Sequence, residues 1–303
     1  MTRQKPMVLH APAKINLYLD VLEKRPDGYH ELISLMCCIG IHDTVRLSFD
    51  ILHADNRITV ACDHPEVPSG PDNLAHRAAA AFFEATGLAP GLSIAIEKQI
   101  PVGAGLGGGS SNAAAVLTGL NRHFGFPLPD NQLMTLGGGL GADVPFFISG
   151  RPAVARGIGE KLSPFSEIPD MPIVLVYPGC PVSTGTVYKK LNLALTKTKK
   201  IHTKFIFETG NYTDICKHLY NVLEPVAMEL CPEIGAAKQA LIAGGADGAL
   251  MSGSGSSVFG IFPEAQKAEN ACRKLSGNSN WQVFHTRLRK SCRNEDWNPS
   301  ANH

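Results

Sequence analysis

The chain has 303 residues, and its 28 Lys and Arg residues nearly balance 27 Asp and Glu residues, which gives a net charge of +1. This balance provides no general attraction for a polyanion, so nucleic-acid or membrane-surface binding would need a local basic patch. The nearest patch is interpreted as a solvated loop and consists of Lys197, Lys199, Lys200 and Lys204. No apolar run approaches the roughly 18 residues of a membrane span, and the N-terminus lacks signal-peptide features. We therefore expect a cytoplasmic protein that binds neither nucleic acid nor membranes.

The length exceeds what one hydrophobic core usually serves, which predicts two domains with a small-molecule cleft between them. We place an N-terminal domain at residues 1–165, a C-terminal domain at residues 166–290 and a flexible tail at residues 291–303. The eight cysteines contain no C-x-x-C pair, so neither a zinc site nor a redox motif is predicted. We expect reduced, mostly buried thiols. A weak homodimer is left open.

In the first hundred residues, alternation of apolar and polar positions predicts β-strands. We expect them at residues 8–22, 31–41, 44–49, 57–61 and 92–97. An Ala-rich helix is expected at residues 73–85, because Gly87 follows as a stop signal. Beyond a glycine-rich loop, residues 112–124 predict a second helix, and a third begins at residue 131.

The second half of the chain predicts a mixture of strands and helices. Two strands are expected within residues 152–178, and the continuous apolar run at residues 173–177 is typical of a strand buried on both faces. Residues 195–212 are interpreted as a surface connection. We expect a helix at residues 232–243, followed at residues 249–262 by two short apolar runs around a small-residue turn.

The most informative string is PVGAGLGGGSSN at residues 101–112, directly ahead of an Ala-rich helix. Glycines at this density let consecutive backbone N–H groups converge on one point, and the helix directs its positive end to the same point. Phosphate is the ligand that this geometry fits, while a tightly packed glycine turn is the alternative. The serines are expected to cap the helix or to donate to phosphate oxygens. The residues assigned to this cradle are Pro101, Val102, Gly103, Ala104, Gly105, Leu106, Gly107, Gly108, Gly109, Ser110 and Ser111.

Three familiar phosphate loops are excluded. The dinucleotide fingerprint G-x-G-x-x-G needs an acidic residue ending a second strand, and the candidate at the required spacing, Asp130, lies in a predicted loop. A Walker A loop needs G-K-[ST], but Ser110 follows Gly109 without an intervening Lys. A protein kinase would require H-R-D and D-F-G downstream, and neither string occurs.

Two further glycine strings follow, one at residues 137–145, where Asp143 is the single acid, and one at residues 253–257. With the loop at residues 101–112 and the basic Lys14 near the N-terminus, they resemble the motif set of the GHMP kinase superfamily. The motifs occur in order across nearly the whole chain.

The strings APAKINL (residues 11–17), RPDGYHE (25–31) and GADVPFF (141–147) narrow the resemblance to the 4-diphosphocytidyl-2-C-methyl-D-erythritol kinase family. The match is weakest at residues 192–220 and 291–303. The resemblance implies ATP-dependent phosphorylation of the substrate's 2-hydroxyl in the non-mevalonate isoprenoid pathway. It also implies an α+β fold of two-domain GHMP kinase architecture, in which the second domain carries two helices on an antiparallel sheet and the substrate cleft lies between the domains.

Two residues carry the implied chemistry. The acceptor is a hindered tertiary alcohol, which needs a base and strict alignment. Asp143 fits the base because it is the one acid inside a glycine-rich string, although a helix N-cap or loop carboxylate is the alternative. Lys14 is flanked by apolar strand residues, and the resemblance implies that its ammonium meets Asp143 and the acceptor oxygen. Taken alone, Lys14 would more often be a solvated edge residue.

The implied cosubstrate is ATP, with Mg²⁺ as its counter-ion. The loop amides, the helix N-terminus and the metal ion would stabilise the transferred charge. No acidic cluster marks a magnesium site, and Ser111 is the best single candidate for a ligand. The family pattern adds Asn73 and Lys98 as ATP contacts, and for Lys98 a charge at a strand edge is nearly as good an interpretation.

The implied partner is a small-molecule substrate that carries a cytidine diphosphate group. A selective cytosine pocket needs aromatic stacking partners and hydrogen-bonding groups. Tyr29 and His30 follow a turn, and Asn16 on the first strand is assigned to the same pocket. The resemblance implies that Tyr188 closes over the base from the opposite side, with Thr184 nearby. Ordinary packing is the alternative for both tyrosines.

Two other functions are alternatives. A nucleotide-binding regulator without catalysis would keep the phosphate loop, but it would not need Lys14 and Asp143. Another GHMP kinase, acting on galactose, homoserine or a mevalonate derivative, is disfavoured by the D-G-Y-H-E string at residues 27–31.

Overall fold

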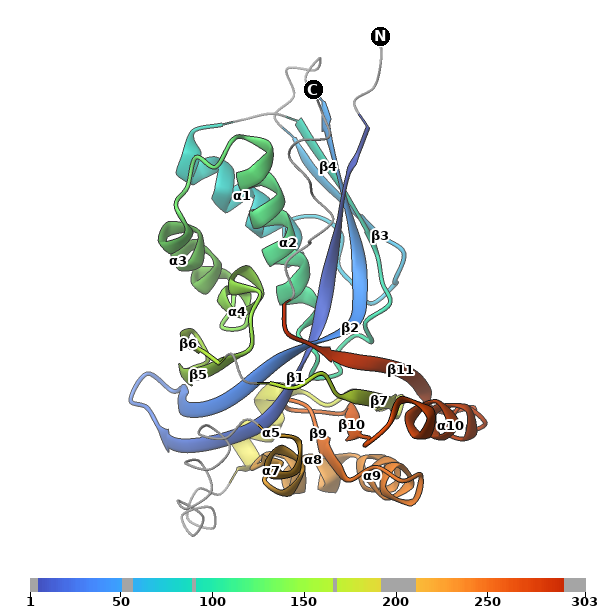
Figure 1. Cartoon of the computed structure of the whole chain (residues 1–303). Helices are drawn as coiled ribbons and strands as arrows, with labels where there is room; N and C mark the ends of the chain where they lie inside the picture. Colours follow the sequence, from blue (N-terminus) through green and yellow to red (C-terminus); the bar gives the residue numbers. More distant parts are fainter. Residues whose placement is uncertain (1–4, 51–56, 89–90, 166–167, 192–210, 292–303) are drawn as a thin grey trace.

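The computed structural model describes residues 5–50, 57–88, 91–165, 168–191 and 211–291 (Figure 1). The basic patch, the tail beyond residue 291 and nearly all of the expected surface connection lie outside these ranges. None of the helices within them is long and apolar enough to span a lipid bilayer.

The N-terminal half forms a sheet of mostly antiparallel strands. Its members are β1 Met7–Lys24, β2 His30–Asp50, β3 Ile58–Cys62, β4 Gly91–Glu97, β5 Ala153–Gly157 and β6 Lys161–Pro164. β1 and β2 pair along most of their length, from Met7↔Leu47 to Lys24↔His30. β4 pairs antiparallel with β2 and parallel with β3, and β5 pairs with the first part of β2. The predicted strands of this half are confirmed, with β1 and β2 longer than expected.

The sequence predicted two extended segments where the structure has the single strand β2. The break was placed at His42 and Asp43, which interrupt the apolar pattern. In the structure Asp43 is completely buried and still pairs with Ala11 of β1. The strand continues because this carboxylate binds the Lys98 ammonium and the backbone N–H groups of Gln99 and Ile100, which offsets the cost of burying its charge.

Helices α1 Leu74–Thr86, α2 Gly108–His123, α3 Asp130–Leu140 and α4 Val144–Ser149 lie together on one side of this sheet (Figure 1). The predicted helix at residues 73–85 is confirmed as α1. The helix begins after Asn73, whose side-chain oxygen accepts the N–H of Ala75 at 2.8 Å. It ends at Gly87 in the left-handed conformation, as the stop signal indicated.

Two glycine-rich stretches are more helical than expected. α2 begins at Gly108, with Gly107 as an N-cap that makes no side-chain capping bond, so Ser110 and Ser111 lie inside the first turns and do not cap the helix. The second glycine string is also partly helical, since its first glycines lie in α3. A Cβ at Gly137 would lie 2.7 Å from the Ile148 side chain. Glycine therefore permits close packing between α3 and α4, and that packing offsets its low helix propensity.

The C-terminal half forms an antiparallel sheet. Its strand order is β11 (Gln282–Arg289), β7 (Pro172–Tyr177), β10 (Val258–Ile261) and β9 (Gly248–Met251). Two helices pack on this sheet, α9 (Glu233–Ala243) and α10 (Ala265–Leu275). Helices α5, α7 and α8 also belong to this half (Figure 1). A two-residue strand, β8, pairs with β1 of the N-terminal sheet. All six residues of the strand at Pro172–Tyr177 are buried, which confirms burial on both faces. The shorter elements are α5 Thr184–Lys190, α7 Tyr212–Lys217, β8 Tyr220–Asn221 and α8 Glu224–Leu230.

The last strand joins the two halves. β11 pairs with β7 along its length and then with β2 at Leu288↔Ile39. One hydrophobic cluster also runs through both halves and contains Ile15 and Ile100 together with Phe259. The two halves therefore share a core, and a boundary near residue 165 stays a prediction.

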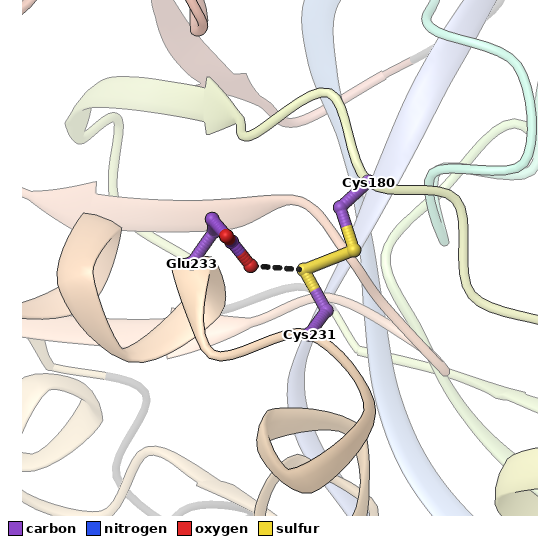
Figure 2. Close-up of a disulfide and its surroundings, with 3 residues drawn as sticks. All are labelled: Cys180, Cys231 and Glu233. Atoms are coloured by element: carbon purple, nitrogen blue, oxygen red, sulfur yellow. Dashed lines mark hydrogen bonds between the residues drawn. A yellow bond between two sulfur atoms is a disulfide. The ribbon is translucent and has the colours of Figure 1, made fainter.

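Cys180 and Cys231 form a disulfide that links the segment before α5 to the end of α8 (Figure 2). The prediction of reduced cysteines is wrong for this pair. The two residues are 51 positions apart and meet only through tertiary packing, so no spacing motif could reveal them. A carboxylate oxygen of Glu233 lies 3.5 Å from the Cys231 sulfur. Among the residues that the structure describes, Cys37, Cys62, Cys216 and Cys272 are free thiols.

Candidate active site

A cleft of about 1500 Å³ is lined by residues from both halves of the molecule. The glycine string contributes one wall, and β1, the turn after it, α5 and the turn between β9 and β10 contribute others. Every residue that the sequence assigned to the site lines this cleft except Ser111. Ser111 is almost completely buried, and its hydroxyl has no hydrogen-bond partner among the described residues.

The shape of the glycine string depends on its glycines. Gly105 and Gly107 have φ of 76° and 71°, a region that other residues adopt reluctantly. A Cβ at Gly105 would lie 2.2 Å from the carbonyl oxygen of Ser252, and one at Gly107 would lie 3.0 Å from the Phe147 ring. α2 starts at the next residue, and its first N–H groups have no acceptor within the helix. The loop and the start of the helix thus have the backbone geometry that suits an anion, and binding of phosphate there stays a prediction.

The third glycine string supports the first one from the C-terminal half. The Ser252 hydroxyl donates to the Gly105 carbonyl at 3.1 Å, and the Ser257 N–H donates to the Ala104 carbonyl at 3.2 Å. Asn221, which sequence reasoning missed, donates to the Gly253 carbonyl at 2.8 Å. The predicted turn between two apolar runs is therefore confirmed, and its contacts explain why the two strings occur in one protein.

Lys14 is held in place by a chain of buried polar groups. Its ammonium donates to the Asn16 side-chain oxygen at 2.7 Å, and Asn16 donates to the Ser34 hydroxyl at 2.7 Å. Ser34 in turn donates to the Tyr18 carbonyl at 2.7 Å. The Lys14 N–H donates to the Leu106 carbonyl at 3.0 Å, which ties β1 to the glycine string. The residue Lys14 is only 5% exposed, so its ammonium is not a solvated charge at a strand edge.

Asp143 lies 3.7 Å from the Lys14 ammonium, measured from Oδ2 to Nζ, and about a third of its side chain is exposed to the cleft. It occupies the N-cap position of α4, but its side chain makes no capping hydrogen bond. The N-cap interpretation is therefore correct for the position of Asp143 in the chain, but its carboxylate does not cap the helix. A carboxyl group beside a buried ammonium, open to a cleft, is placed where a general base could reach a bound acceptor.

The other two nucleotide-side candidates already have protein partners. Asn73 caps α1 and donates to the Pro68 carbonyl at 2.7 Å. Lys98 is nearly buried and binds Asp43, a residue that sequence reasoning missed, although a lone acid within an apolar pattern was a signal for it. A contact of either residue with ATP stays a prediction.

The D-G-Y-H-E string forms a turn whose shape its own residues fix. The Asp27 carboxylate accepts the Tyr29 N–H at 3.1 Å, Gly28 has φ of 88°, and Glu31 accepts the Gly157 N–H of β5 at 3.1 Å. This anchoring presents Tyr29, whose residue is 60% exposed, and His30 at one end of the cleft.

His30 and Tyr188 meet across the cleft, with ring centroids 5.1 Å apart and planes tilted by 36°. Burial raises the pKa of Tyr188 to about 12, and the nearby charge of Asp143 adds to this effect. Burial, and secondarily Lys24, lowers the pKa of His30, so its imidazole is neutral at pH 7. The Thr184 hydroxyl lies 2.7 Å from that of Ser254. The structure therefore places Tyr29, His30 and Tyr188 along the same cleft, as the sequence predicted. The ring that Tyr188 contacts is that of His30.

Comparison with known proteins identifies the family of this chain. A model of the GHMP kinases N terminal domain matches residues 73–151, and one of the GHMP kinases C terminal matches residues 205–279. A 4-diphosphocytidyl-2-C-methyl-D-erythritol kinase of Syntrophotalea carbinolica is 48% identical over 274 residues, which cover 90% of this chain and 96% of the relative. This chain belongs to that family. The family's member from Geobacter metallireducens is 44% identical, with 93% and 99% covered.

Solved structures of other kinases have the same fold as this chain. The crystal structure of a 4-(cytidine 5'-diphospho)-2C-methyl-D-erythritol kinase matches with a TM-score of 0.78 at 36% identity, covering 93% of this chain and 99% of the other. A homoserine kinase from Cytophaga hutchinsonii matches with a TM-score of 0.76 at 18% identity, with 96% and 97% covered, which speaks to fold alone. The predicted α+β architecture of a GHMP kinase is confirmed.

Proposed function

We propose that the chain transfers a phosphoryl group from ATP to the 2-hydroxyl of 4-diphosphocytidyl-2-C-methyl-D-erythritol, a step of the non-mevalonate isoprenoid pathway. Family membership supports the substrate, because relatives of that name cover the chain almost end to end. The observation that supports the chemistry is the Lys14–Asp143 pair, which opens to the cleft beside the backbone-built anion site.

In this proposal Asp143 takes the proton from the tertiary hydroxyl as the oxygen attacks the phosphoryl group. Lys14 stabilises negative charge on the Asp143 carboxylate and on the acceptor oxygen. Because the Lys14 side chain is little exposed, few water molecules screen its positive charge, and its attraction for nearby negative charge is stronger. The hydrogen bond to Asn16 holds the ammonium in place beside Asp143.

The glycine string and the N-terminus of α2 are proposed to bind the phosphates of ATP. Mg²⁺ is proposed as the counter-ion of the nucleotide, where it would neutralise part of the phosphate charge. The structure does not support Ser111 as its ligand, since that hydroxyl is buried and does not line the cleft. No protein ligand to the ion is assigned.

The cytidine group is proposed to bind at the end of the cleft lined by Tyr29, His30 and Tyr188. Aromatic faces can stack on the base, and a neutral imidazole offers one donor and one acceptor to its edge. Because ATP is the phosphoryl donor, we place the reaction in the cytoplasm. A weak homodimer stays a prediction.

The test is ADP production by the purified protein with a panel of acceptors. The cytidyl substrate should give turnover, and mevalonate derivatives, homoserine and galactose should not. Turnover with one of the other acceptors would assign a different GHMP activity. ATP binding without turnover on any acceptor would favour the non-catalytic regulator.

A further inference from the structure

The buried ion pair of Asp43 and Lys98 lies beside the anion site but takes no part in the chemistry described above. Asp43 comes from the middle of β2 and is completely buried, and the side chain of Lys98, which follows β4 directly, is 5% exposed. Both residues are charged types that are rarely buried without a partner. Their burial beside the cleft therefore suggests that the pair has a role in positioning the site.

The two oxygens of Asp43 have different partners. Oδ1 accepts the backbone N–H groups of Gln99 and Ile100, each at 2.9 Å, and Oδ2 accepts from the Lys98 ammonium. Gln99 and Ile100 directly precede Pro101, where the glycine string begins. One carboxylate thus fixes both the start of the string and the ammonium beside it.

The ammonium points at the first turn of α2. A Cβ on Gly108 would lie 3.0 Å from Lys98 Nζ, so the missing side chain at Gly108 provides the space that the ammonium occupies. Lys98 lines the cleft, and three donors on its ammonium leave hydrogen bonds available beyond the one to Asp43. A positive charge there adds to the positive end of the helix.

We propose that Asp43 is a positioning residue for nucleotide binding: it holds the Lys98 ammonium against the N-terminus of α2, where that ammonium contacts a phosphate of ATP. The inference rests on the proposed function only in taking the glycine string as the ATP site. Without Asp43 the ammonium, on a flexible stem, would lose its fixed position over the loop.

The first test is Asp43→Asn, which keeps an oxygen acceptor for the two backbone N–H groups but removes the charge that binds Lys98. We expect KM for ATP and the calorimetric Kd of ATP to rise roughly 10- to 100-fold, the range for a hydrogen bond between charged groups. KM for the cytidyl substrate should stay within about twofold, because that substrate is proposed to bind to a different set of residues, Tyr29, His30 and Tyr188. Glu97→Gln is the matched control, since Glu97 pairs with Arg46 across the same two strands but on an exposed face.

The second test is a double-variant cycle with Lys98→Met. If Asp43 acts through Lys98, Asp43→Asn should add no further loss of ATP binding in the Lys98→Met background. The double variant also carries no unpaired buried charge, so it should fold even where a single variant does not. Wild-type ATP affinity in Asp43→Asn, or additive losses in the double variant, would overturn the proposal and leave Asp43 as an anchor of the backbone.

Calorimetry with ATP alone separates this proposal from the assignment of the acceptor. A wild-type protein that binds ATP but does not phosphorylate the cytidyl substrate would contradict the proposed function, and the ATP affinities of the variants would still decide the role of Asp43.

Discussion

The two ends of the cleft are built in different ways. At the phosphate end, positive-φ glycines and the start of α2 form the site from backbone, and the turn after β9 supports them from behind. At the end proposed to bind the cytidine group (the cytidine end), the side chains of His30, the first residue of β2, and Tyr188 of the short helix α5 lie against one another, with ring centroids 5.1 Å apart. A backbone site changes only if the chain path changes, whereas a side-chain site can be altered one group at a time. Substitutions at the two ends should therefore fail in different ways.

The largest effect is expected at the junction of the two ends, where Asp143 faces Lys14. Asp143→Asn should bind both substrates but lower kcat by about 10²- to 10⁴-fold, because an amide cannot accept the proton. Steady-state kinetics and calorimetric binding of ATP measure the two quantities separately. Asp170→Asn, which breaks an exposed ion pair with Arg287, serves as the control. Near-normal turnover of Asp143→Asn would remove this residue from the role of base.

At the phosphate end, Gly107→Val should weaken ATP binding at least roughly tenfold, since a β-branched residue at positive φ costs about 1–3 kcal/mol. Its Cβ would also lie 3.2 Å from the Lys14 side chain, so kcat should fall as well. Calorimetry and thermal unfolding measure the change. Gly139→Ala, in α3 with open space around it, should leave ATP affinity unaltered and raise the unfolding temperature slightly, because alanine has the higher helix propensity. Unchanged ATP affinity in Gly107→Val would show that the phosphates bind elsewhere.

At the cytidine end, Tyr188→Ala should raise KM for the cytidyl substrate by the equivalent of about 1–3 kcal/mol, the value of one stacked base. Tyr29→Ala should have a smaller effect in the same direction, because its ring is largely in solvent. KM for ATP should change little in both. Phe126→Ala, an exposed aromatic outside the cleft, is the control. Equal losses for both substrates would return the tyrosines to ordinary packing.

The smallest effect concerns His30. Because its pKa lies below the ordinary value of 6.5, the ring is neutral at pH 7 and becomes charged only as the pH falls through that lowered pKa. Protonation removes the acceptor, so KM for the cytidyl substrate should rise by a few-fold between about pH 7 and pH 5. His30→Ala should lose this pH dependence and discriminate less between cytidine and uridine versions of the substrate. A pH profile identical to that of the wild type would place the titrating group elsewhere.

The sequence alone determined those features that depend on neighbouring residues. The glycine string, the helix stop at Gly87 and the alternation of β1 could all be predicted, because φ/ψ preference and side-chain period act over a few positions. The lone acids and bases, Asp143 and Lys14, also stood out within strings of small or apolar residues.

Tertiary structure decided what depends on residues far apart in the chain. Only the fold brings Asp43 of β2 to Lys98, Cys180 to Cys231 and His30 to Tyr188. It also decided that α2 begins at Gly108, because burial of its Ala-rich face against β1 and α1 outweighs the low helix propensity of glycine. These outcomes arise from packing and from pairing of buried charges, which act between surfaces that the chain brings together only on folding.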